Sequence, residues 1–570
     1  MNILAINPGH NGSAALLIDG DIKFYIEEER LSRSKYDANP FKGMMKALKY
    51  GVDILVLGGT NEVFPQLPWT GEDPYSGFLR KFNPRLQVIN VGGAHHIGHA
   101  AGAFYNSGFD QAAAVIVDGS GSRRNVNVNG EFKNSGFETE TIFNCDYEDG
   151  IKPVFNSYGG NYDTQRIFNE DLSMDSSITI VKSYEAVSDY LGFGFIEAGK
   201  TMGLAPYGKK NSSIPDLFIE GRGNKNVFTP NYPAGAYVDH TRFSFLSLKE
   251  DSRTWHQDPS KITEAAKDLA WAIQDKTQEL VGDLIDKAVE KTGQTNIVIA
   301  GGYGLNCVAN YYYKKRFPKL NIFVDPISHD GGTSIGLAYL VHYQNTNDKT
   351  KRPLTSLYLG PEQNFKYDFG DIKTTDVTPA DIAKILSDKN IVAMVQGRSE
   401  AGPRALGNRS ILYDPTDPKG KDTVNKVKGR EWFRPFAGSI MQEYFKEWFD
   451  TYGMEETPFM MYAMDFKEEK HGECPAITHV DGTCRIQTVT KKQNKVYHTL
   501  INEFRKITGV PILFNTSFNL GGEPLVETIE DAIKTIKNSD INYLYLPETG
   551  KLIHYPYNDS LIENIKEEAA

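Results

Sequence analysis

The sequence predicts an α/β protein with more than one domain. Its 570 residues exceed what a single hydrophobic core usually serves. Short apolar strands, such as residues 3–6, 113–117 and 297–300, each run into a loop of small residues. A polar, unpatterned stretch over residues 341–357 separates two regions of this kind. Hydrophobic residues at 40% and charged residues at 24% are ordinary for a globular protein.

The N-terminus predicts a meander of three strands. Residues 3–6 and 14–18 are apolar, and the loop between them contains Asn7, Gly9 and His10. Asp19-Gly20 then makes a tight turn into the strand 22–26. A meander that opens with a small-residue loop is typical of the actin/Hsp70/sugar-kinase architecture, so we expect that architecture here.

Glycine-rich loops follow two other apolar strands, at residues 113–117 and 297–300. Residues 113–117 run into Asp118-Gly119-Ser120-Gly121, and residues 297–300 run into Gly301-Gly302, with Asn306 a few residues on. Glycines after a strand let backbone N–H groups approach an anion closely. The loops therefore predict phosphate binding.

His95 and His99 are one helical turn apart in the sequence. Residues at i and i+4 project from the same side of a helix, so two imidazoles there can hold one divalent metal. On their own, the two histidines are equally well explained as buried or surface residues. The nearby phosphate-type loops favour the metal, and they point to an enzyme acting on a nucleotide or an acyl phosphate.

Composition excludes several classes of protein. The net charge of −11 argues against a general nucleic-acid coat, although it leaves room for a local basic site. We find neither a signal-peptide pattern nor an apolar run near the roughly 20 residues that span a bilayer. The four cysteines have no metal-site or disulfide spacing. We therefore expect a cytoplasmic protein with no membrane association.

A domain boundary is expected between residues 345 and 375, which gives domains of 1–350 and 351–570. The second domain opens with a buried strand at 391–395 and is expected to end with the strand 510–514. Residues 131–183 are rich in aromatics, Asn, Ser and Gly, and we interpret them as an inserted lid.

The second domain holds a basic stretch within an acidic chain. Residues 398–434 contain nine Lys or Arg against five Asp or Glu. Such a run is usually a solvated helix face. Arg404 and Arg434, however, are flanked by Gly, Pro and Phe, which favours arginines fixed for phosphate recognition.

Two further motifs belong with these arginines. Arg485 lies beyond a predicted turn, and Ser517 follows the buried strand 510–514, with Asn519 next to it. Ser517 can donate to phosphate or ribose oxygens, or it can cap the local backbone.

Long motifs recur along the chain in a fixed order. The first half contains Asn7-Pro8-Gly9-His10, Glu29-Arg30-Leu31-Ser32-Arg33-Ser34-Lys35, His95-His96-Ile97-Gly98-His99, Asp118-Gly119-Ser120-Gly121, Gly199-Lys200-Thr201-Met202-Gly203, Gly301-Gly302 and His329-Asp330-Gly331-Gly332. The second half contains Glu400-Ala401-Gly402-Pro403-Arg404-Ala405-Leu406-Gly407, Arg434-Pro435-Phe436, Asp481-Gly482-Thr483-Cys484-Arg485 and Asn515-Thr516-Ser517-Phe518-Asn519.

Through these motifs the chain resembles, over nearly its whole length, the O-carbamoyltransferases that modify antibiotics and nodulation factors. In that family the N-terminal domain is Kae1-like, an actin/Hsp70-like fold of two related subdomains, and the C-terminal domain is a YrdC-like α/β domain with a twisted mixed sheet.

The resemblance implies an ATP-dependent reaction in two steps. Carbamoyl phosphate and ATP, both substrates, would give carbamoyl adenylate and pyrophosphate in the C-terminal domain. The N-terminal domain would then transfer the carbamoyl group to an acceptor hydroxyl. Iron(II) or another divalent metal would serve the transfer, and Mg²⁺ would accompany ATP.

The resemblance also implies the binding residues. His95, His99 and Asp330 would hold the metal, and Asp118 would lie close to it and to the nucleotide. The residues that would contact the nucleotide or its phosphates in the N-terminal domain are Asn7, Gly9, Gly119, Ser120, Gly121, Lys200, Gly301, Gly302 and Asn306. Those that would bind carbamoyl phosphate and adenylate in the C-terminal domain are Arg404, Lys428, Arg434, Arg485, Ser517 and Asn519.

Three residues are assigned to catalysis: His10, Lys35 and Asp118. His10 is our candidate for the base that activates the acceptor hydroxyl, with donation to phosphate as an equal alternative. Lys35 would hold the phosphate or the acceptor, and the alternative is an ordinary surface lysine.

The acceptor is left open by the sequence. It is expected among small molecules such as a sugar or an antibiotic, or as a hydroxymethyl-pyrimidine in a nucleotide or nucleic acid, and a homodimer also remains open. Two rival functions were weighed. A threonylcarbamoyl-type tRNA-modifying enzyme would need a basic surface that a chain at −11 does not indicate. A non-catalytic actin/Hsp70-like nucleotide switch would leave the His95, His99 and Asp330 set and the arginines unexplained.

Overall fold

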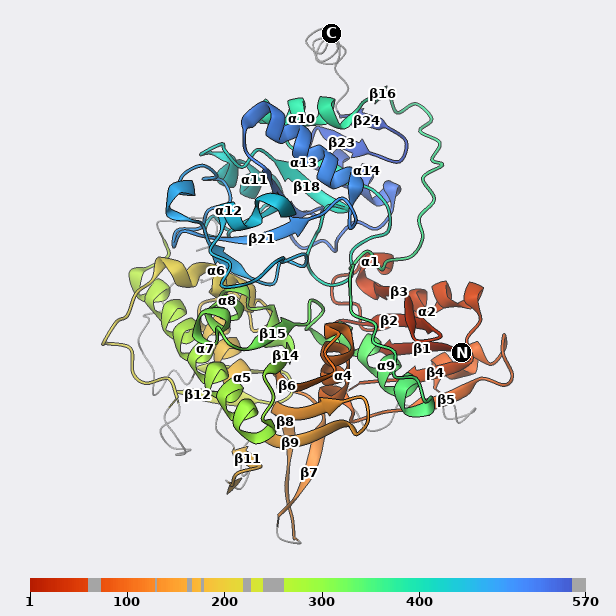
Figure 1. Ribbon diagram of the computed structural model, residues 1–570, viewed down its shortest axis with the longest axis vertical. Coiled ribbons are helices and arrows are strands. Elements are labelled where there is room, and N and C mark those ends of the chain that lie inside the picture. Colours follow the sequence, from red (N-terminus) through yellow and green to blue (C-terminus); the bar gives the residue numbers. More distant parts are fainter. Residues whose placement is uncertain are drawn as a thin grey trace. The chain divides into compact units, whose positions relative to one another are not determined.

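The computed structural model describes residues 1–59, 73–128, 131–160, 167–175, 179–218, 227–238 and 261–555. Contacts divide the chain into two compact units, drawn in Figure 1. Unit 1 contains Met1–Glu28 and Tyr36–Leu354, and unit 2 contains Glu29–Lys35 and Thr355–Ala570. Each unit combines sheets with helices, so the predicted α/β class is confirmed.

The first sheet of unit 1 is built from the N-terminal meander. Its strand order is β3 (Asp21–Glu27), β2 (Ser13–Ile18), β1 (Asn2–Asn7), β4 (Ile54–Leu57) and β5 (Gln87–Asn90). The first three strands are antiparallel, and β4 and β5 continue parallel to β1. The apolar residues of β1 and β2, apart from Ile18, are fully buried, as the sequence predicts for this meander.

The second sheet of unit 1 repeats this order and these directions. Strand β6 (Gln111–Val117) is flanked on one side by antiparallel β8 (Glu131–Asp146) and β9 (Gly150–Gly159), and on the other by parallel β14 (Asn296–Ala300) and β15 (Asn321–Val324). Strand β11 (Leu172–Asp175) pairs with β9 and with β10 (Ile167–Phe168), and β7 (Arg123–Val128) pairs with β8.

The interpretation of residues 131–183 as a lid is therefore wrong for its described part. Residues 131–159 form two central strands of the second sheet, and residues 180–183 begin helix α5 (Ile180–Tyr190). Alternating aromatic and polar residues fit a strand that has one apolar and one polar face. The same composition is typical of a loop, which explains the wrong interpretation. Residues 161–166 and 176–178 of that segment lie outside the described residues.

Helices α4 (His95–Ser107) and α9 (Thr333–Asn345) pack closely against each other in unit 1, as Figure 1 shows. A Cβ built on Gly336 would lie 1.9 Å from the carbonyl oxygen of Gly98, so glycine permits this approach. The other helices of the unit are α2 (Phe41–Ala47), η1 (Leu48–Tyr50), α3 (Pro74–Leu79), α5, α6 (Ala198–Leu204), η2 (Ala205–Tyr207), α7 (Glu264–Thr292), η5 (Gly302–Leu305), α8 (Cys307–Arg316) and η6 (Asp330–Gly332), and a small hairpin joins β12 (Phe228–Asn231) to β13 (Gly235–Val238).

Unit 2 is built on one mixed sheet. Its strand order is β16 (Thr374–Asp376), β24 (Lys551–His554), β23 (Tyr543–Leu546), β17 (Val392–Val395), β18 (Arg409–Tyr413), β22 (Ile512–Ser517), β19 (Ala437–Met441), β21 (Thr483–Val489) and β20 (Ala463–Asp465). The pairs β17–β23 and β19–β21 are parallel, and the remaining pairs are antiparallel. The unit continues beyond the strand that we expected to end it.

The helices of unit 2 are α1 (Glu28–Ser32), whose residues from Glu29 on belong to this unit, α10 (Pro379–Ser387), α11 (Gly420–Lys428), η7 (Gln442–Tyr444), α12 (Phe445–Trp448), η8 (Glu468–Lys470), α13 (Lys495–Thr508) and α14 (Ile529–Lys537). Capping boxes at Thr378 and Thr528 fix the starts of α10 and α14. Helix α13 buries its apolar stripe, which includes Leu500 and Phe504.

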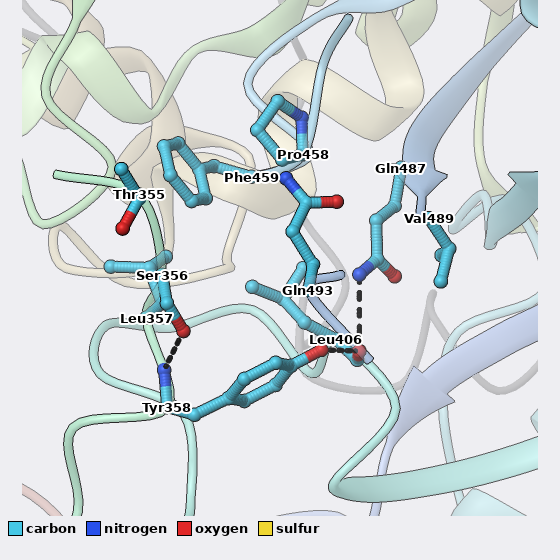
Figure 2. Close-up of a pocket in the computed structure, with 10 residues that line it drawn as sticks. All are labelled: Thr355, Ser356, Leu357, Tyr358, Leu406, Pro458, Phe459, Gln487, Val489 and Gln493. Carbon is cyan, nitrogen blue, oxygen red and sulfur yellow. Dashed lines mark hydrogen bonds between the residues drawn. The ribbon is translucent and has the colours of Figure 1, made fainter. Parts of the chain in front are cut away.

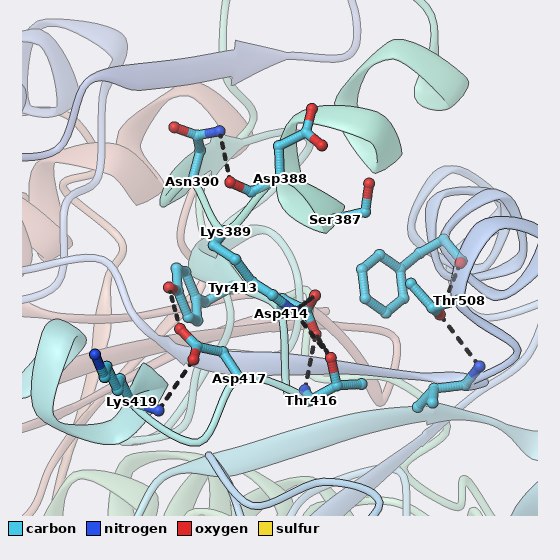
Figure 3. A network of polar contacts seen from close by, with 12 residues as sticks. Ser387, Asp388, Lys389, Asn390, Tyr413, Asp414, Thr416, Asp417, Lys419 and Thr508 are labelled. Atoms are coloured by element: carbon cyan, nitrogen blue, oxygen red, sulfur yellow. Dashed lines mark hydrogen bonds and ion pairs between the residues drawn. The ribbon is translucent and has the colours of Figure 1, made fainter.

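Polar side chains hold the turn that follows β18, as Figure 3 shows. Asp414 is buried and accepts hydrogen bonds from the backbone N–H and the hydroxyl of Thr416, both at 2.7 Å. It also forms an ion pair with Lys389. The Tyr413 hydroxyl donates to Asp417 at 2.7 Å. These contacts satisfy each buried polar group locally, so the network is structural.

Among the described residues, no helix combines the length and the apolar character needed to cross a bilayer.

Candidate metal centre and anion site

Four side chains of unit 1 converge on one point. His95 and His99 lie on the first turns of α4, Asp118 follows β6, and Asp330 opens η6 just before α9. One ligand atom from each lies within 4.8 Å of all the others. The structure thus brings together the three predicted ligands and adds Asp118.

The distances show how tightly the atoms meet. His95 Nε2 lies 3.1 Å from Asp118 Oδ2 and 3.6 Å from Asp330 Oδ1. His99 Nε2 lies 3.2 Å from His95 Nε2 and 3.9 Å from Asp330 Oδ1. Both imidazoles are almost fully buried. Two nitrogen and two carboxylate donors facing one point are a ligand set for a divalent transition metal.

The charges of the cluster are strongly coupled. Burial opposes a charged imidazole, but Asp330 and Asp118 outweigh it and raise the pKa of His95 well above its ordinary value. Burial and the positive charge on His95 lower the pKa of His99 to about 3. Burial raises the pKa of both aspartates, but contacts with His95 bring each below its usual range. One proton on His95 thus occupies the place where a cation would balance two carboxylates.

Neighbouring loops orient these ligands. The Asn7 side-chain amide donates to the Asp330 carbonyl at 3.0 Å, and the Gly302 N–H donates to Asp118 Oδ1 at 3.1 Å. Gly301 has φ +88, and a Cβ there would lie 2.3 Å from the Val117 carbonyl oxygen. The glycine pair therefore lets the end of β14 approach the end of β6 and fix Asp118.

The loop after β6 does not present all its amides to a ligand. The Gly121 N–H donates to the Glu138 carbonyl at 2.7 Å, and a Cβ on Gly119 would lie 2.6 Å from Glu185 Oε1. These two glycines therefore make room for packing. The Ser120 hydroxyl is buried, and no described residue accepts or donates a hydrogen bond to it.

The remaining residues predicted for unit 1 lie in different settings. Asn306 is buried and caps α8 by accepting from the Ala309 N–H at 3.1 Å, while its amide donates to Gln274 at 2.9 Å. The Gly9 N–H donates to the Ala38 carbonyl, and Lys200 pairs with Glu197 at 3.7 Å.

His10 lies at the rim of the cluster. Its Nδ1 is 3.7 Å from Asp330 Oδ2, and its side chain is 60% exposed. An exposed imidazole beside a partly buried carboxylate can exchange a proton with a substrate from solvent.

Unit 2 contains a second cluster, made of cations. Arg404, Lys428, Arg434 and Arg485 were predicted, and the structure adds Arg430. We call these five residues together with Lys35 the cationic cluster. Burial, Arg434, Arg485 and Arg404 lower the pKa of Arg430 well below its ordinary value, and burial, Arg430 and Arg434 do the same for Lys428.

The register of the sheet explains why these residues meet. Arg485 pairs with Ala437, Ala437 pairs with Asn515, and Ser517 pairs with Ser410. The starts of β18, β19 and β21 and the end of β22 therefore share one edge of the sheet. The loops carrying Arg404, Arg430 and Arg434 lead into that edge.

Lys428 binds the end of β22 directly. Its ammonium donates to the Ser517 carbonyl, to the Asn519 carbonyl at 2.7 Å and to Asn519 Oδ1 at 3.2 Å. The Ser517 hydroxyl donates to the same Asn519 oxygen at 2.6 Å. The structure thus places Lys428, Ser517 and Asn519 together, and the Ser517 hydroxyl bonds to the Asn519 side chain.

Carboxylates are fewer than cations around this cluster. Arg434 pairs with Glu431 at 3.3 Å, Lys35 lies 4.0 Å from Glu29, and Glu523 acts electrostatically on Lys428. No described residue accepts a hydrogen bond from Arg430 Nε or Arg485 Nε, and both atoms are buried. The cluster therefore carries an excess of positive charge that suits a multiply charged anion.

Arg430 is one of the nine basic residues in the stretch 398–434, and the sequence does not predict it as a site residue. Its guanidinium lies over the Phe436 ring at 4.7 Å, and Gly429 before it adopts φ +60. An arginine after a glycine that ends a helix, six residues before an aromatic, is the signal that could have identified it.

The residues that line the pocket in Figure 2 include no member of the cationic cluster. The Gln487 amide and the Tyr358 hydroxyl both donate to the Leu406 carbonyl, at 3.0 and 2.8 Å. Leu406 is two residues from Arg404, so these side chains support the loop on which Arg404 lies. The pocket lining contains no charged residue.

Comparison with known proteins identifies the family. Residues 77–339 match the family model described as carbamoyltransferase N-terminus, and residues 383–551 match the one described as carbamoyltransferase C-terminus. The chain belongs to the carbamoyltransferase family. The resemblance seen in the sequence and the prediction of a carbamoyltransferase enzyme are confirmed, and a non-catalytic switch is excluded.

Named relatives of this carbamoyltransferase span most of its length. Nodulation protein NolNO of Sinorhizobium fredii is 30% identical over 94% of this chain and 78% of its own. Nodulation protein NolO of Bradyrhizobium diazoefficiens is 32% identical over 79% of this chain and 77% of its own. The 3′-hydroxymethylcephem-O-carbamoyltransferase of Streptomyces clavuligerus is 25% identical over 96% of this chain and 98% of its own.

Proposed function

We propose that this carbamoyltransferase is ATP-dependent, transfers its carbamoyl group to a hydroxyl, and works in two steps at two sites. At the cationic cluster of unit 2, carbamoyl phosphate and ATP give carbamoyl adenylate and pyrophosphate. Atom balance requires that one water enters and that the phosphate of carbamoyl phosphate leaves as inorganic phosphate. At the His95, His99, Asp118 and Asp330 cluster of unit 1, the carbamoyl group passes to the acceptor, and AMP leaves.

The excess of cations in unit 2 carries this proposal. Both substrates of the first step are anions, and pyrophosphate release develops further charge on phosphate oxygens. Arginines fixed in the site offset this charge in the transition state. The depressed pKa values of Lys428 and Arg430 indicate that burial of these cations is costly until an anion joins them.

The four-residue cluster of unit 1 fits a divalent metal. Two imidazoles and two carboxylates are a mixed donor set that suits iron(II) or another transition ion better than magnesium. When bound, such an ion supplies Lewis acidity to the carbamoyl group or its leaving phosphate. Mg²⁺ is proposed only as the partner of ATP.

The chain's own residues would carry the proton transfers and positioning. His10, at the rim, accepts the proton of the acceptor hydroxyl. Gly302 and Asn7 hold Asp118 and the backbone of Asp330 in place. We place the nucleotide along the loops of Gly9, Ser120, Gly301 and Gly302. Asn306 would shape this site through α8, because its amide is already engaged.

We infer finer fold relationships from topology. The two sheets of unit 1 share one strand order and one set of directions, which supports an actin/Hsp70-like, Kae1-like unit of two related subdomains. The mixed sheet of unit 2 supports a YrdC-like domain. We propose the division of labour at residue 350 with one addition: residues 29–35 serve the C-terminal domain.

We propose a small-molecule alcohol as the acceptor. A relative at 25% identity is named for a hydroxymethylcephem acceptor, and the two nodulation relatives are more similar in sequence. The hydroxymethylcephem name favours antibiotic hydroxyls, and the sugar hydroxyls expected from the sequence are the second class to test. Incubating the enzyme with ATP, carbamoyl phosphate and a panel of such alcohols should yield one product heavier by a carbamoyl group, as measured by mass spectrometry.

The first step can be tested without an acceptor. The purified protein with ATP, Mg²⁺ and carbamoyl phosphate should release pyrophosphate, and carbamoyl adenylate should be detected by mass spectrometry. Pyrophosphate release should stop when carbamoyl phosphate is omitted. Carbamoyl transfer without ATP consumption would overturn the two-step proposal.

A further inference from the structure

Residues Glu29–Lys35 belong to unit 2, although the chain before and after them belongs to unit 1. They follow strand β3 and include most of helix α1. We call this seven-residue stretch the crossing segment. Its arginines, Arg30 and Arg33, contact two loops of unit 2. These loops carry Arg404 and Asn519, and we call the cationic cluster together with Ser517 and Asn519 the anion site.

Arg30 holds the loop that carries Arg404. The Arg30 side chain is buried, and its two terminal nitrogens donate to the carbonyls of Glu400 and Gly402, the latter at 2.5 Å. Both carbonyls lie within four residues of Arg404. A guanidinium that bridges two carbonyls fixes their spacing as well as their position.

The same loop is closed from within by a buried carboxylate. Glu400 Oε1 accepts the backbone N–H groups of Leu406 and Asn408, each at 2.7 Å, and of Arg409 at 3.2 Å. The turn is therefore rigid across its base. Arg30 supplies the contact that ties it to the crossing segment.

Arg33 holds the turn beyond Asn519. Its terminal nitrogens donate to the carbonyls of Leu525 at 2.6 Å and Pro524 at 2.9 Å. That turn also binds itself to the site, because the Asn519 amide donates to the Glu523 carbonyl at 2.7 Å. The Gly521 N–H donates in turn to the Lys428 carbonyl at 2.9 Å.

The backbone of Arg33 is itself unusual. It adopts φ +63, a left-handed conformation that is strained for a residue other than glycine. The Arg33 N–H donates to the Glu29 carbonyl at 2.9 Å and ends α1 there. The two hydrogen bonds from the Arg33 side chain to the Leu525 and Pro524 carbonyls compensate for this strain.

We propose that the crossing segment is a positioning element of the anion site, in which Arg30 and Arg33 hold the loops of Arg404 and Asn519 at their working distance. Neither arginine need touch substrate. This inference rests on the proposed function of the cationic cluster. It assigns to N-terminal residues a part in the reaction of the C-terminal unit.

Binding of inorganic pyrophosphate to the full-length protein, measured by calorimetry, tests the inference. The variants Arg30→Ala and Arg33→Ala should each raise the dissociation constant about tenfold or more in protein that still shows a cooperative melting transition. Arg505→Ala is the matched control. That arginine belongs to the same unit, contacts Asn502 and the Tyr444 ring, and should leave binding unchanged.

A lysine at position 30 separates positioning from charge. Arg30→Lys keeps the cation, but a single ammonium cannot span two carbonyls as the guanidinium does, so binding should stay weak. If Arg30→Ala does not fold, Arg33→Ala and Arg30→Lys carry the test.

The opposite outcomes are distinct. Full recovery in Arg30→Lys, or wild-type affinity in both alanine variants, would overturn the positioning role. Failure of the wild-type protein itself to bind pyrophosphate would instead overturn the proposed function.

Discussion

The Nε2 atoms of His95 and His99 lie 3.2 Å apart, one helical turn from each other on α4. Two imidazole nitrogens approach this closely only when a proton or a cation lies between them or beside them. The carboxylates of Asp118 and Asp330, which come from two other loops, lie close to the same two nitrogens. The arrangement is therefore a ligand set gathered from three separate parts of unit 1.

We expect His99→Ala to lose bound divalent metal and carbamoyl transfer, while carbamoyl adenylate still forms in the acceptor-free assay. The reason is that this change removes one of four donors and leaves unit 2 untouched. Elemental analysis of the purified variant measures the metal. His96→Gln is the control, because His96 on the same helix contacts Thr141 at 2.7 Å and lies outside the ligand set. Unchanged metal content in His99→Ala would refute the site.

Arg434→Ala or Arg485→Ala should slow adenylate formation about a hundredfold. Each removes a fixed cation from a multiply charged anion, and one such contact is worth about 2–3 kcal/mol, or roughly a hundredfold in rate. Supplied with carbamoyl adenylate made separately, each variant should still carbamoylate the acceptor, as product analysis would show. If a folded, metal-loaded variant cannot be rescued in this way, a single site performs both steps.

Arg430→Ala should weaken ATP binding about as much as the loss of the predicted arginines. Its Nε is buried without an acceptor among the described residues, and its pKa is depressed by burial and by Arg434, Arg485 and Arg404. Relief of this repulsion should also raise the melting temperature of the ligand-free protein. Calorimetric titration with ATP and thermal melts check the two effects. Lower stability together with unchanged ATP affinity would show that Arg430 is structural.

Gly336→Ala should destabilise unit 1 by about 1–3 kcal/mol, because the added Cβ would meet the Gly98 carbonyl oxygen at 1.9 Å. Since α4 carries His95 and His99, the variant should also bind metal less tightly. Thermal melts and metal titration measure both changes. Gly98→Ala is the matched control on the opposite helix. Its Cβ would lie 3.3 Å from the movable Leu337 side chain, so this change should cost much less.

Asp325 gives a pH-dependent prediction. Burial raises the pKa of its carboxyl to about 6, so the folded state holds the proton more tightly than the unfolded chain. The resulting stability is complete below about pH 4 and is lost as the pH rises through 6. At pH 7.5, Asp325→Asn should therefore raise the unfolding free energy by up to about 3 kcal/mol, seen as a higher melting temperature. At pH 4 the substitution should have little effect.

Asp348→Asn is the control of opposite sign. Burial opposes ionisation there, but hydrogen bonds from Thr350 and His342 hold the pKa of Asp348 below its usual range. Its contribution to stability is present at neutral pH and lost in acid. The variant should melt lower at pH 7.5. A parallel response of Asp325→Asn and Asp348→Asn would contradict both assignments.

The strands that organise both sites could be predicted from local patterns. The meander at the N-terminus and the strands before Asp118 and Gly301 are short apolar runs ended by small residues, and the structure has strands there. The helix carrying His95 and His99 could be predicted because one turn separates the pair. The strands at residues 131–159 could not be predicted, because a strand with one polar and one apolar face has the composition of an exposed loop.

Sequence patterns were weaker for residues whose role depends on tertiary partners. Asn306 follows a glycine-rich loop and looked like a ligand for a nucleotide, but it caps α8 and bonds to Gln274 from another helix. Arg430 looked like one more charge in a basic run until the sheet edge brought Arg485 beside it. No local pattern records which distant strand will lie next to a loop.

The crossing segment also has a consequence for how the chain folds. Arg33 and its partner Leu525 are 492 residues apart in sequence, and Arg30 and Gly402 are 372 apart. Contacts of such long range are slow to form, and during synthesis Arg30 and Arg33 emerge long before either carbonyl exists. The loops of Arg404 and Asn519 can then reach their final geometry only in a late folding step, after both halves of the polypeptide have been made. Under the proposed function, the site for carbamoyl phosphate would therefore be the last part of the molecule to be completed.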